Sequence, residues 1–164
     1  MNPHVAVLMG GWSAEREVSL ISGRACALAL RGTGYRVTEV DVDETLTHQL
    51  SGLKPDVVFN ALHGRWGEDG CVQGLLELLR LPYTHSGVRA SAIAMHKPSS
   101  LEVFRAHGIP CAESCLTTPA AVNAKDPMDR PYVVKPPAEG STFGVRIVRS
   151  GDNNPPVNAG WNFG

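Results

Sequence analysis

The chain has 164 residues, of which 43% are hydrophobic and 19% are charged, and its formal net charge is -1. This balance is typical of a globular protein, and without a basic excess there is no electrostatic case for a nucleic-acid partner. No stretch approaches the roughly 18 apolar residues of a membrane span, and no Lys or Arg precedes the first apolar run. We therefore expect a cytoplasmic protein with no membrane partner.

Residues 4–9, HVAVLM, predict a first strand, because they are a short apolar run that ends at Gly10 and Gly11. A helical pattern follows as far as Gly32, and Ser13 is a suitable N-cap for it. The three-and-four spacing of apolar residues predicts the buried face of this helix to carry Val18, Ile21, Ala25, Leu28 and Ala29. Glu15 would then lie in the first turn, away from the apolar stripe.

Strands and helices alternate along the following residues. Alternating or apolar runs predict strands over 35–42 and 56–62, with a short polar stretch between them and a fourth short strand starting at 81–83. Helical patterns cover 71–79, 90–95 and 98–107. This alternation favours an α/β fold with a parallel sheet.

The last part of the chain has a different character. Residues 131–136 and 145–149 predict two strands of a hairpin, joined by the Gly-rich loop EGSTFG at 139–144. We place a domain boundary near residue 96, which gives domains 1–95 and 96–164.

The four cysteines do not form a convincing metal site or disulfide. Cys111 and Cys115 are the only close pair, and in an extended strand they would lie about 13 Å apart, too far for a bridge or a shared zinc ion. We expect no metal site in this chain and reduced cysteines.

Three residues mark places where chemistry could occur. Glu15 follows a strand and a Gly turn, where it could bind a ligand ammonium group or merely complement the helix dipole. His63, after the third strand, could orient a substrate carboxylate or bond to a neighbouring loop. Lys135, before the EGSTFG loop, could form a phosphate clamp with it, or the loop could be a flexible hairpin with a solvated lysine.

Three stretches together resemble the D-alanine:D-alanine ligases, which are ATP-grasp enzymes. They are GGWSAEREVSL at 10–20, ALHGRWGEDGCVQGLLELLRLPYTHSGVRASAIAMHK at 61–97 and PYVVKPPAEGSTFGV at 131–145. The resemblance covers almost the whole chain in the family's order and spacing. It implies a Rossmann-like parallel-sheet domain over 1–95 and an incomplete ATP-grasp small subdomain, of α+β type, over 96–164.

The resemblance also implies an activity. The family joins two D-alanines into D-alanyl-D-alanine for peptidoglycan in the cell wall, using ATP and magnesium and passing through an acyl phosphate. D-alanine and ATP would be the small-molecule partners, and the intact enzyme would be a cytoplasmic homodimer.

The site residues follow from the same resemblance. Glu15 would pair with the ammonium group of the first D-alanine, with Ser141 in the same catalytic network, and His63 and Val18 would contact that substrate. The ATP phosphates would be held by the two lysines and the closing loop, namely Lys97, Lys135, Gly140, Ser141, Thr142, Phe143 and Gly144.

The chain departs from the family pattern at three places. His96 stands where the family usually has Asp, and Thr142-Phe143 stands where it has Ser-Val. After Lys135 the only acidic residues are Glu139 and Asp152. The magnesium ligands and the second ATP-grasp subdomain are therefore expected in a missing C-terminal part, and we expect the 164-residue chain to be inactive alone.

Two alternatives stay open at this point. The first strand, Gly10-Gly11 and an acidic residue at Asp41 or Asp43 would also suit the dinucleotide-binding domain of an oxidoreductase, although the third glycine of that motif is missing. The chain could also be a ligase fragment that binds its ligands without turnover.

Overall fold

A computed structural model describes residues 2–158, 160, 161 and 163. The chain divides into two compact units, Met1–Ala94 and Met95–Gly164.

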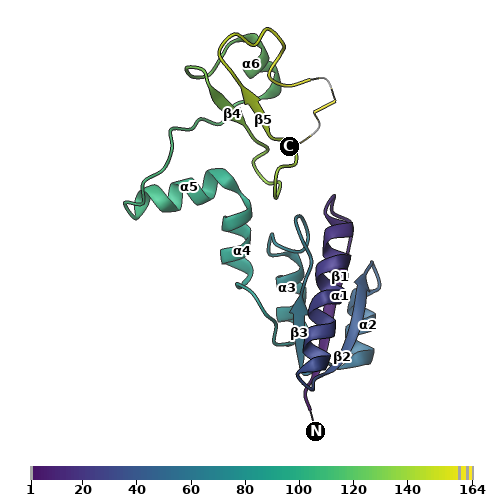
Figure 1. Ribbon diagram of the computed structural model, residues 1–164. Helices are drawn as coiled ribbons and strands as arrows, with labels where there is room; N and C mark the ends of the chain where they lie inside the picture. The colour runs from purple at the N-terminus through teal and green to yellow at the C-terminus, as the bar shows by residue number, and fades with distance from the viewer. Residues whose placement is uncertain (1, 159, 162, 164) are drawn as a thin grey trace. The chain divides into compact units, whose positions relative to one another are not determined.

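The first unit is built on a three-stranded parallel sheet in the order β2-β1-β3 (Figure 1). Its strands are β1 (His4–Gly10), β2 (Arg36–Val42) and β3 (Val57–Asn60). The central strand is buried along its whole length, as expected of an apolar strand covered on both faces. The three predicted strands and the parallel α/β sheet are confirmed. The fourth predicted strand is reduced to a single bridge between Val58 and Tyr83.

Helix α1 (Arg16–Gly32) covers one face of the sheet with small residues. Its buried positions are Ser19, Gly23 and Ala27, and a Cβ added to Gly23 would lie 2.6 Å from the Cβ of Met9. The predicted buried face is therefore wrong. The side chains of Val18, Ile21 and Leu28 are 54%, 70% and 71% exposed. Ala25 and Ala29 are exposed as well. The reason is the close approach of helix and strand at Gly23, where a larger side chain would meet Met9. The partly buried Leu20 and Leu30 of α1 pack against the buried cluster that contains Met9 and Ala27.

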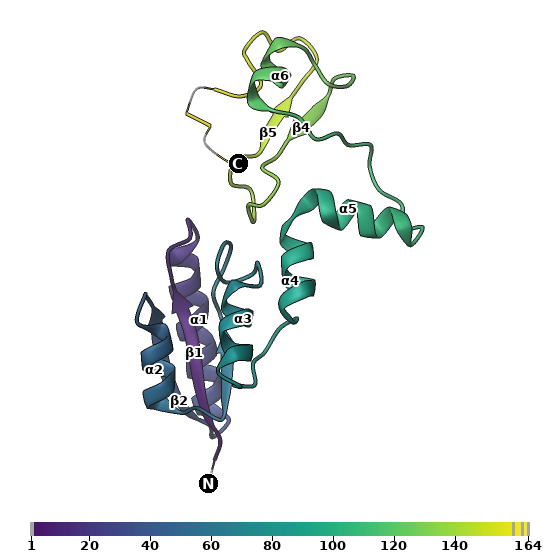
Figure 2. The same cartoon turned by 180° about the vertical axis from the view of Figure 1, so that it is seen from behind.

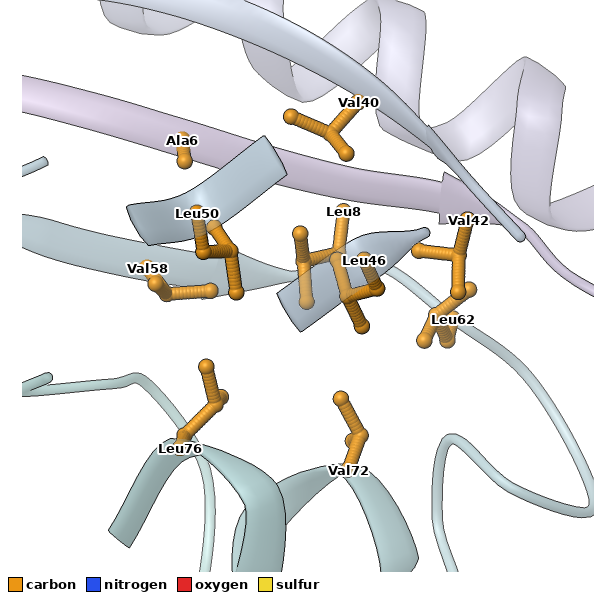
Figure 3. Close-up of a cluster of buried hydrophobic side chains, with 10 residues drawn as sticks. All are labelled: Ala6, Leu8, Val40, Val42, Leu46, Leu50, Val58, Leu62, Val72 and Leu76. Atoms are coloured by element: carbon orange, nitrogen blue, oxygen red, sulfur yellow. The ribbon is translucent and has the colours of Figure 1, made fainter. Parts of the chain in front are cut away.

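The opposite face is covered by α2 (Leu46–Leu53) and α3 (Cys71–Leu78), as Figure 2 shows. The aliphatic side chains of these helices meet those of the sheet in one buried cluster (Figure 3). Helix α2 lies in the stretch that we predicted as merely polar, so that interpretation was wrong. Its polar residues point outward, while Leu46 and Leu50 carry the contact with the sheet.

Helix α4 (Val88–Met95) reaches the boundary between the units, and α5 (Lys97–Ala106) begins the second unit. A short helix α6 (Pro119–Ala124), for which we predicted no element, packs with Val122 against the antiparallel pair β4 (Tyr132–Val134) and β5 (Arg146–Val148). The predicted hairpin around the EGSTFG loop is confirmed. Residues 111–115 form no strand, and all four cysteines are free thiols.

Candidate functional site

The strand order of the first unit fixes where a ligand would bind. The chain runs from β1 to β2 on one side and returns to β3 on the other side of β1. In open α/β sheets this reversal leaves a crevice at the carboxyl ends of the two diverging strands. Here the loops that follow β1 and β3 meet at that edge, and they contain Glu15 and His63.

A serine hydroxyl joins the two loops. Ser13 Oγ donates a hydrogen bond to the carbonyl oxygen of His63 (2.7 Å) and accepts one from the backbone N–H of Glu15 (3.1 Å). We predicted Ser13 as the N-cap of α1, and this is wrong: the helix begins at Arg16, and Glu15 occupies the N-cap position. The Ser13 hydroxyl is committed to the neighbouring loop instead.

A second serine fixes the start of α1 against both strands. Ser19 is fully buried; its Oγ donates to the carbonyl oxygen of Ala61 (2.7 Å) and accepts from the N–H of Gly10 (2.9 Å). Backbone groups at the ends of β1 and β3 are thereby satisfied without water. The helix that carries Glu15 is held in a defined position relative to both strands.

The carboxylate of Glu15 lies directly against the loop that follows β3. Gly64 has a positive φ of 69°, and a Cβ added there would lie 2.6 Å from Oε2 of Glu15. A side chain at position 64 would therefore displace the carboxylate and would also strain the backbone. Glycine at this position makes the approach of Glu15 possible.

His63 is held from two sides. Its Nε2 lies 2.9 Å from Ser22 Oγ, on α1, and its Nδ1 lies 3.8 Å from Oε1 of Glu68. The other carboxylate oxygen of Glu68 accepts the N–H of Gly64 (2.7 Å). The imidazole is one-third exposed, so it remains accessible from the crevice.

The loop after β3 owes its shape to buried amides. Asn60 Nδ2 and Gln73 Nε2 both donate to the carbonyl oxygen of Gly67, at 2.8 and 2.9 Å. Asn60 Oδ1 accepts the N–H of Leu62 at 3.1 Å. Because Asn60 and Gln73 are each 1% exposed, these bonds are shielded from water and keep the loop rigid.

Asp41, a candidate for a ribose-binding carboxylate, is occupied by an ion pair. Arg16 binds both of its oxygens, at 2.7 and 2.6 Å, next to Gly10. The hydrogen bonds from Arg16 hold the pKa of Asp41 below its usual value. This carboxylate already has a bidentate partner, so the dinucleotide-binding alternative receives no support here.

A cavity of about 210 Å³ lies on the α2–α3 side of the same two loops. The rings of Trp12 and Trp66 meet edge to face at 6.5 Å, and both line it, with Leu62 and Val72. His63 contributes to its wall, whereas Glu15 does not.

The second unit brings together the two candidate phosphate-binding lysines. Lys97, at the start of α5, donates from its backbone N–H to the carbonyl oxygen of Pro137 (2.8 Å) and from Nζ to that of Glu139 (2.6 Å). Burial, followed by the charge of Lys135, lowers the pKa of Lys97. Two like charges at one loop form a site that an anion would neutralise.

The EGSTFG loop lies directly beside these lysines. Ser141 and Gly144 have positive φ angles of 51° and 69°, and the side chains of Ser141, Thr142 and Phe143 are exposed. The carbonyl oxygen of Gly144 accepts the indole N–H of Trp161 at 2.7 Å. Glu15 belongs to the first unit and Ser141 to the second.

The sequence pattern singled out Glu15 and His63 but missed the residues that hold them, namely Ser13 in its actual role, Ser19, Ser22, Gly64 and Glu68. One signal was available: Ser22 lies seven residues after Glu15 and therefore on the same face of α1. Among the described residues, no group of three or more His, Cys, Asp or Glu is placed to hold a metal ion. None of the helices in the described ranges is long and apolar enough to cross a membrane.

Comparisons with known proteins agree on one group of enzymes. Residues 44–86 match the family model described as the D-ala D-ala ligase N-terminus. The D-alanine–D-alanine ligase of Parvibaculum lavamentivorans is 63% identical over 164 residues, which cover 98% of this chain and 53% of that protein.

Solved structures give the same result. The crystal structure of the D-alanine–D-alanine ligase from Bacillus anthracis matches with a TM-score of 0.74 and 33% identity, over 90% of this chain and 49% of that chain. The same ligase complexed with ATP matches with a TM-score of 0.72 and 31% identity, over 91% of this chain and 51% of that one. The chain thus spans about half the length of the relatives it matches.

Proposed function

We propose, from the similarity of this chain to D-alanine–D-alanine ligases, that it forms the part of an ATP-dependent ligase that holds the first D-alanine and the phosphates of ATP. The observation that carries the proposal is the meeting of Glu15 and His63 at the crevice beside β1 and β3. The carboxylate of Glu15 suits the ammonium group of an amino acid, and the imidazole of His63 suits its carboxylate.

Three side chains of the first unit would hold the amino acid. Glu15 binds the ammonium group, and the exposed Val18, one turn along α1, contacts the methyl group. His63 orients the carboxylate. In the ligase these groups position the substrate carboxylate for phosphorylation, since proximity and orientation account for a large share of catalysis in such reactions.

The second unit would hold the nucleotide. Lys97 and Lys135 bind the ATP phosphates, the loop from Gly140 to Gly144 closes over them, and Ser141 contributes its hydroxyl group to catalysis. The positive charges stabilise the transferred phosphoryl group, and the closed loop protects the acyl phosphate from water. In this proposal the second unit is part of the small ATP-grasp subdomain. The ATP complex of the Bacillus anthracis ligase supports ATP as the nucleotide.

Magnesium is implied by the family but does not fit the described residues of this chain, because no group of three or more His, Cys, Asp or Glu side chains among them could hold a metal ion. We therefore assign no step to a metal here. We also propose that residues 1–95 and 96–164 form two domains, that the ligase is a cytoplasmic homodimer, and that its product is used for peptidoglycan.

The substitution Glu15→Gln tests the proposal in a ligase-length protein that contains this chain. It removes the charge that binds the ammonium group, so the apparent KM for D-alanine should rise by about one to two decades while that for ATP stays the same. Initial rates of ADP release measure both constants. The matched control is Glu17→Gln, which removes an exposed carboxylate from the same helix and should change neither constant.

Two outcomes decide between the interpretations of Glu15. If Glu15→Gln and Glu17→Gln have the same small effect, Glu15 is a helix-end charge and the amino-acid site is not where we place it. A rise confined to D-alanine supports the proposal.

A further inference from the structure

Ser22 makes a contact that the proposed function does not use. Its Oγ lies 3.0 Å from the carbonyl oxygen of Val18, 3.3 Å from that of Ser19 and 2.9 Å from Nε2 of His63. A hydroxyl group has one proton and two lone pairs. Both carbonyl oxygens only accept, so they are available to the proton of Ser22. With that proton on the helix backbone, a lone pair of Ser22 Oγ is the acceptor for Nε2–H of His63, which is the arrangement of the Nε2 tautomer.

The other edge of the imidazole is held differently. Nδ1 lies 3.8 Å from Oε1 of Glu68, beyond the range of a direct hydrogen bond. The backbone of His63 is tied to α1 by Ser13, and Glu68 is tied to the N–H of Gly64. Within the described part of the chain, the direct hydrogen bond to the ring is the one with Ser22.

The position of Ser22 on α1 gives this bond a role. Glu15, Val18 and Ser22 are spaced by three and four residues and lie on one face of the helix. An amino acid on that face would meet the carboxylate of Glu15 at one end and the Nε2 edge of His63 at the other. The nitrogen that faces this end must carry a proton if it is to donate to a carboxylate.

We propose that Ser22 is a positioning residue that keeps the proton of His63 on Nε2 and aims this N–H at the amino-acid site. The substrate carboxylate then replaces Ser22 as acceptor, or shares the proton with it. This role rests on the proposed function, whereas the hydrogen bond itself does not depend on it.

Nuclear magnetic resonance of the 15N-labelled 164-residue chain tests the tautomer directly, through long-range couplings in the imidazole of His63. In the unsubstituted chain the Nε2 shift should be that of a protonated nitrogen. Ser22→Ala should move it toward a mixture of tautomers, and Ser22→Thr, which keeps the hydroxyl, should restore it. The matched control is Ser51→Ala, because Ser51 makes the same bond to the carbonyl oxygen four residues earlier and, among the described residues, has no hydrogen bond to a histidine.

Unchanged nitrogen shifts in Ser22→Ala would overturn the proposal, as would equal changes in Ser51→Ala. In the ligase-length protein, Ser22→Ala should raise the KM for D-alanine roughly three- to tenfold, leave that for ATP unchanged, and be rescued by Ser22→Thr. The two proposals can fail separately. If the tautomer of His63 responds to Ser22→Ala as expected but the unsubstituted ligase-length protein does not bind D-alanine, the proposed function is overturned. The role of Ser22 in setting the tautomer then still stands.

Discussion

At the scale of single residues, the candidate site depends on small side chains that permit close approach. Gly64 lets the carboxylate of Glu15 lie against the loop after β3, and Ser13 fits between the two loops with both of its hydrogen bonds made. Neither residue carries charge, yet both determine where the charged residue lies. Substitution at such positions acts on the site through geometry.

Gly64→Ala is expected to displace the carboxylate of Glu15 and to lower both D-alanine binding and stability. The new Cβ would occupy space 2.6 Å from Oε2, and the positive φ of 69° adds roughly 1 kcal/mol of backbone strain for a residue with a side chain. Chemical denaturation and D-alanine titration of the ligase-length protein measure the two effects.

Gly74→Ala is the matched control for this substitution. Gly74 lies inside α3, a Cβ there would meet nothing within 4 Å, and alanine favours the helix by about 0.5–1 kcal/mol. We expect this variant to be more stable and to bind normally. A Gly64→Ala protein that binds as well as Gly74→Ala would contradict the close approach of Glu15.

At the scale of elements, α1 shows that apolar periodicity alone does not identify a buried face. The helix carries two stripes: a large apolar one that faces outward, with Ile21 and Leu28, and a small one that faces the sheet, with Gly23 and Ala27. The distance between helix and strand selects the small stripe, since tightly packed interiors leave no space for extra methylene groups.

Two neighbouring residues of α1 are expected to respond in opposite ways to substitution. Ala27→Leu should lower the free energy of unfolding by about 1–3 kcal/mol, because position 27 is fully buried. Leu28→Ala should change it by about 0.5 kcal/mol or less, because that side chain is 71% exposed. Urea denaturation of both variants is the measurement. The reverse order would mean that the originally predicted face is the buried one.

The loop between β4 and β5 leads to a prediction for the nucleotide. Lys135→Ala should weaken the binding of a non-hydrolysable ATP analogue by about one to two decades, since a charge-assisted contact is worth roughly 1.5–3 kcal/mol. The variant should also raise the pKa of Lys97, because the charge of Lys135 contributes to lowering it. Calorimetry of the ligase-length protein measures the affinity, with the exposed Lys125→Ala as control. Equal affinities in both variants would show that the loop does not clamp phosphate.

At the scale of the whole molecule, one buried histidine of the first unit, His4 on β1, contacts β2 and the residue that precedes β3. The ring Nε2 of His4 lies 2.8 Å from Thr38 Oγ1 on β2, and its backbone N–H donates to Asp56 Oδ2, just before β3, at 2.7 Å. Burial, followed by the charge of Arg36, lowers the pKa of His4 from 6.5, against the opposing effect of Asp56. The neutral imidazole is therefore the form that the fold favours.

Acidification should accordingly destabilise the chain. Below pH 6.5 the unfolded chain binds a proton that the folded chain does not, so the free energy of unfolding falls as the pH drops from 6.5 toward the lowered pKa. Above pH 6.5 the contribution of the neutral imidazole of His4 to the free energy of unfolding is fully present. Denaturation curves between pH 5 and 8 measure the slope, which should shrink in His4→Gln and persist in His48→Gln, where the replaced histidine is exposed. An unchanged slope in His4→Gln would assign the effect to other groups.

The sequence by itself determined what local patterns can encode. The strand around Val7 and the turn at Gly10 were predictable, because a buried strand and a tight turn depend on residues within a few positions of each other. The position of Glu15, His63 and Lys135, each next to the end of a predicted strand, was predictable for the same reason. Helix α2 was missed, because eight residues with two buried leucines give too weak a periodic signal.

Only the tertiary structure decided how these pieces meet. The buried face of α1, the approach of Glu15 to Gly64 and the bond between Ser22 and His63 all join residues from separate elements. Their geometry depends on the distance between helix and sheet and on the β2-β1-β3 strand order, which place residues far apart in sequence within a few ångströms. No local pattern contains that distance, because it results from the packing of all side chains in the unit together.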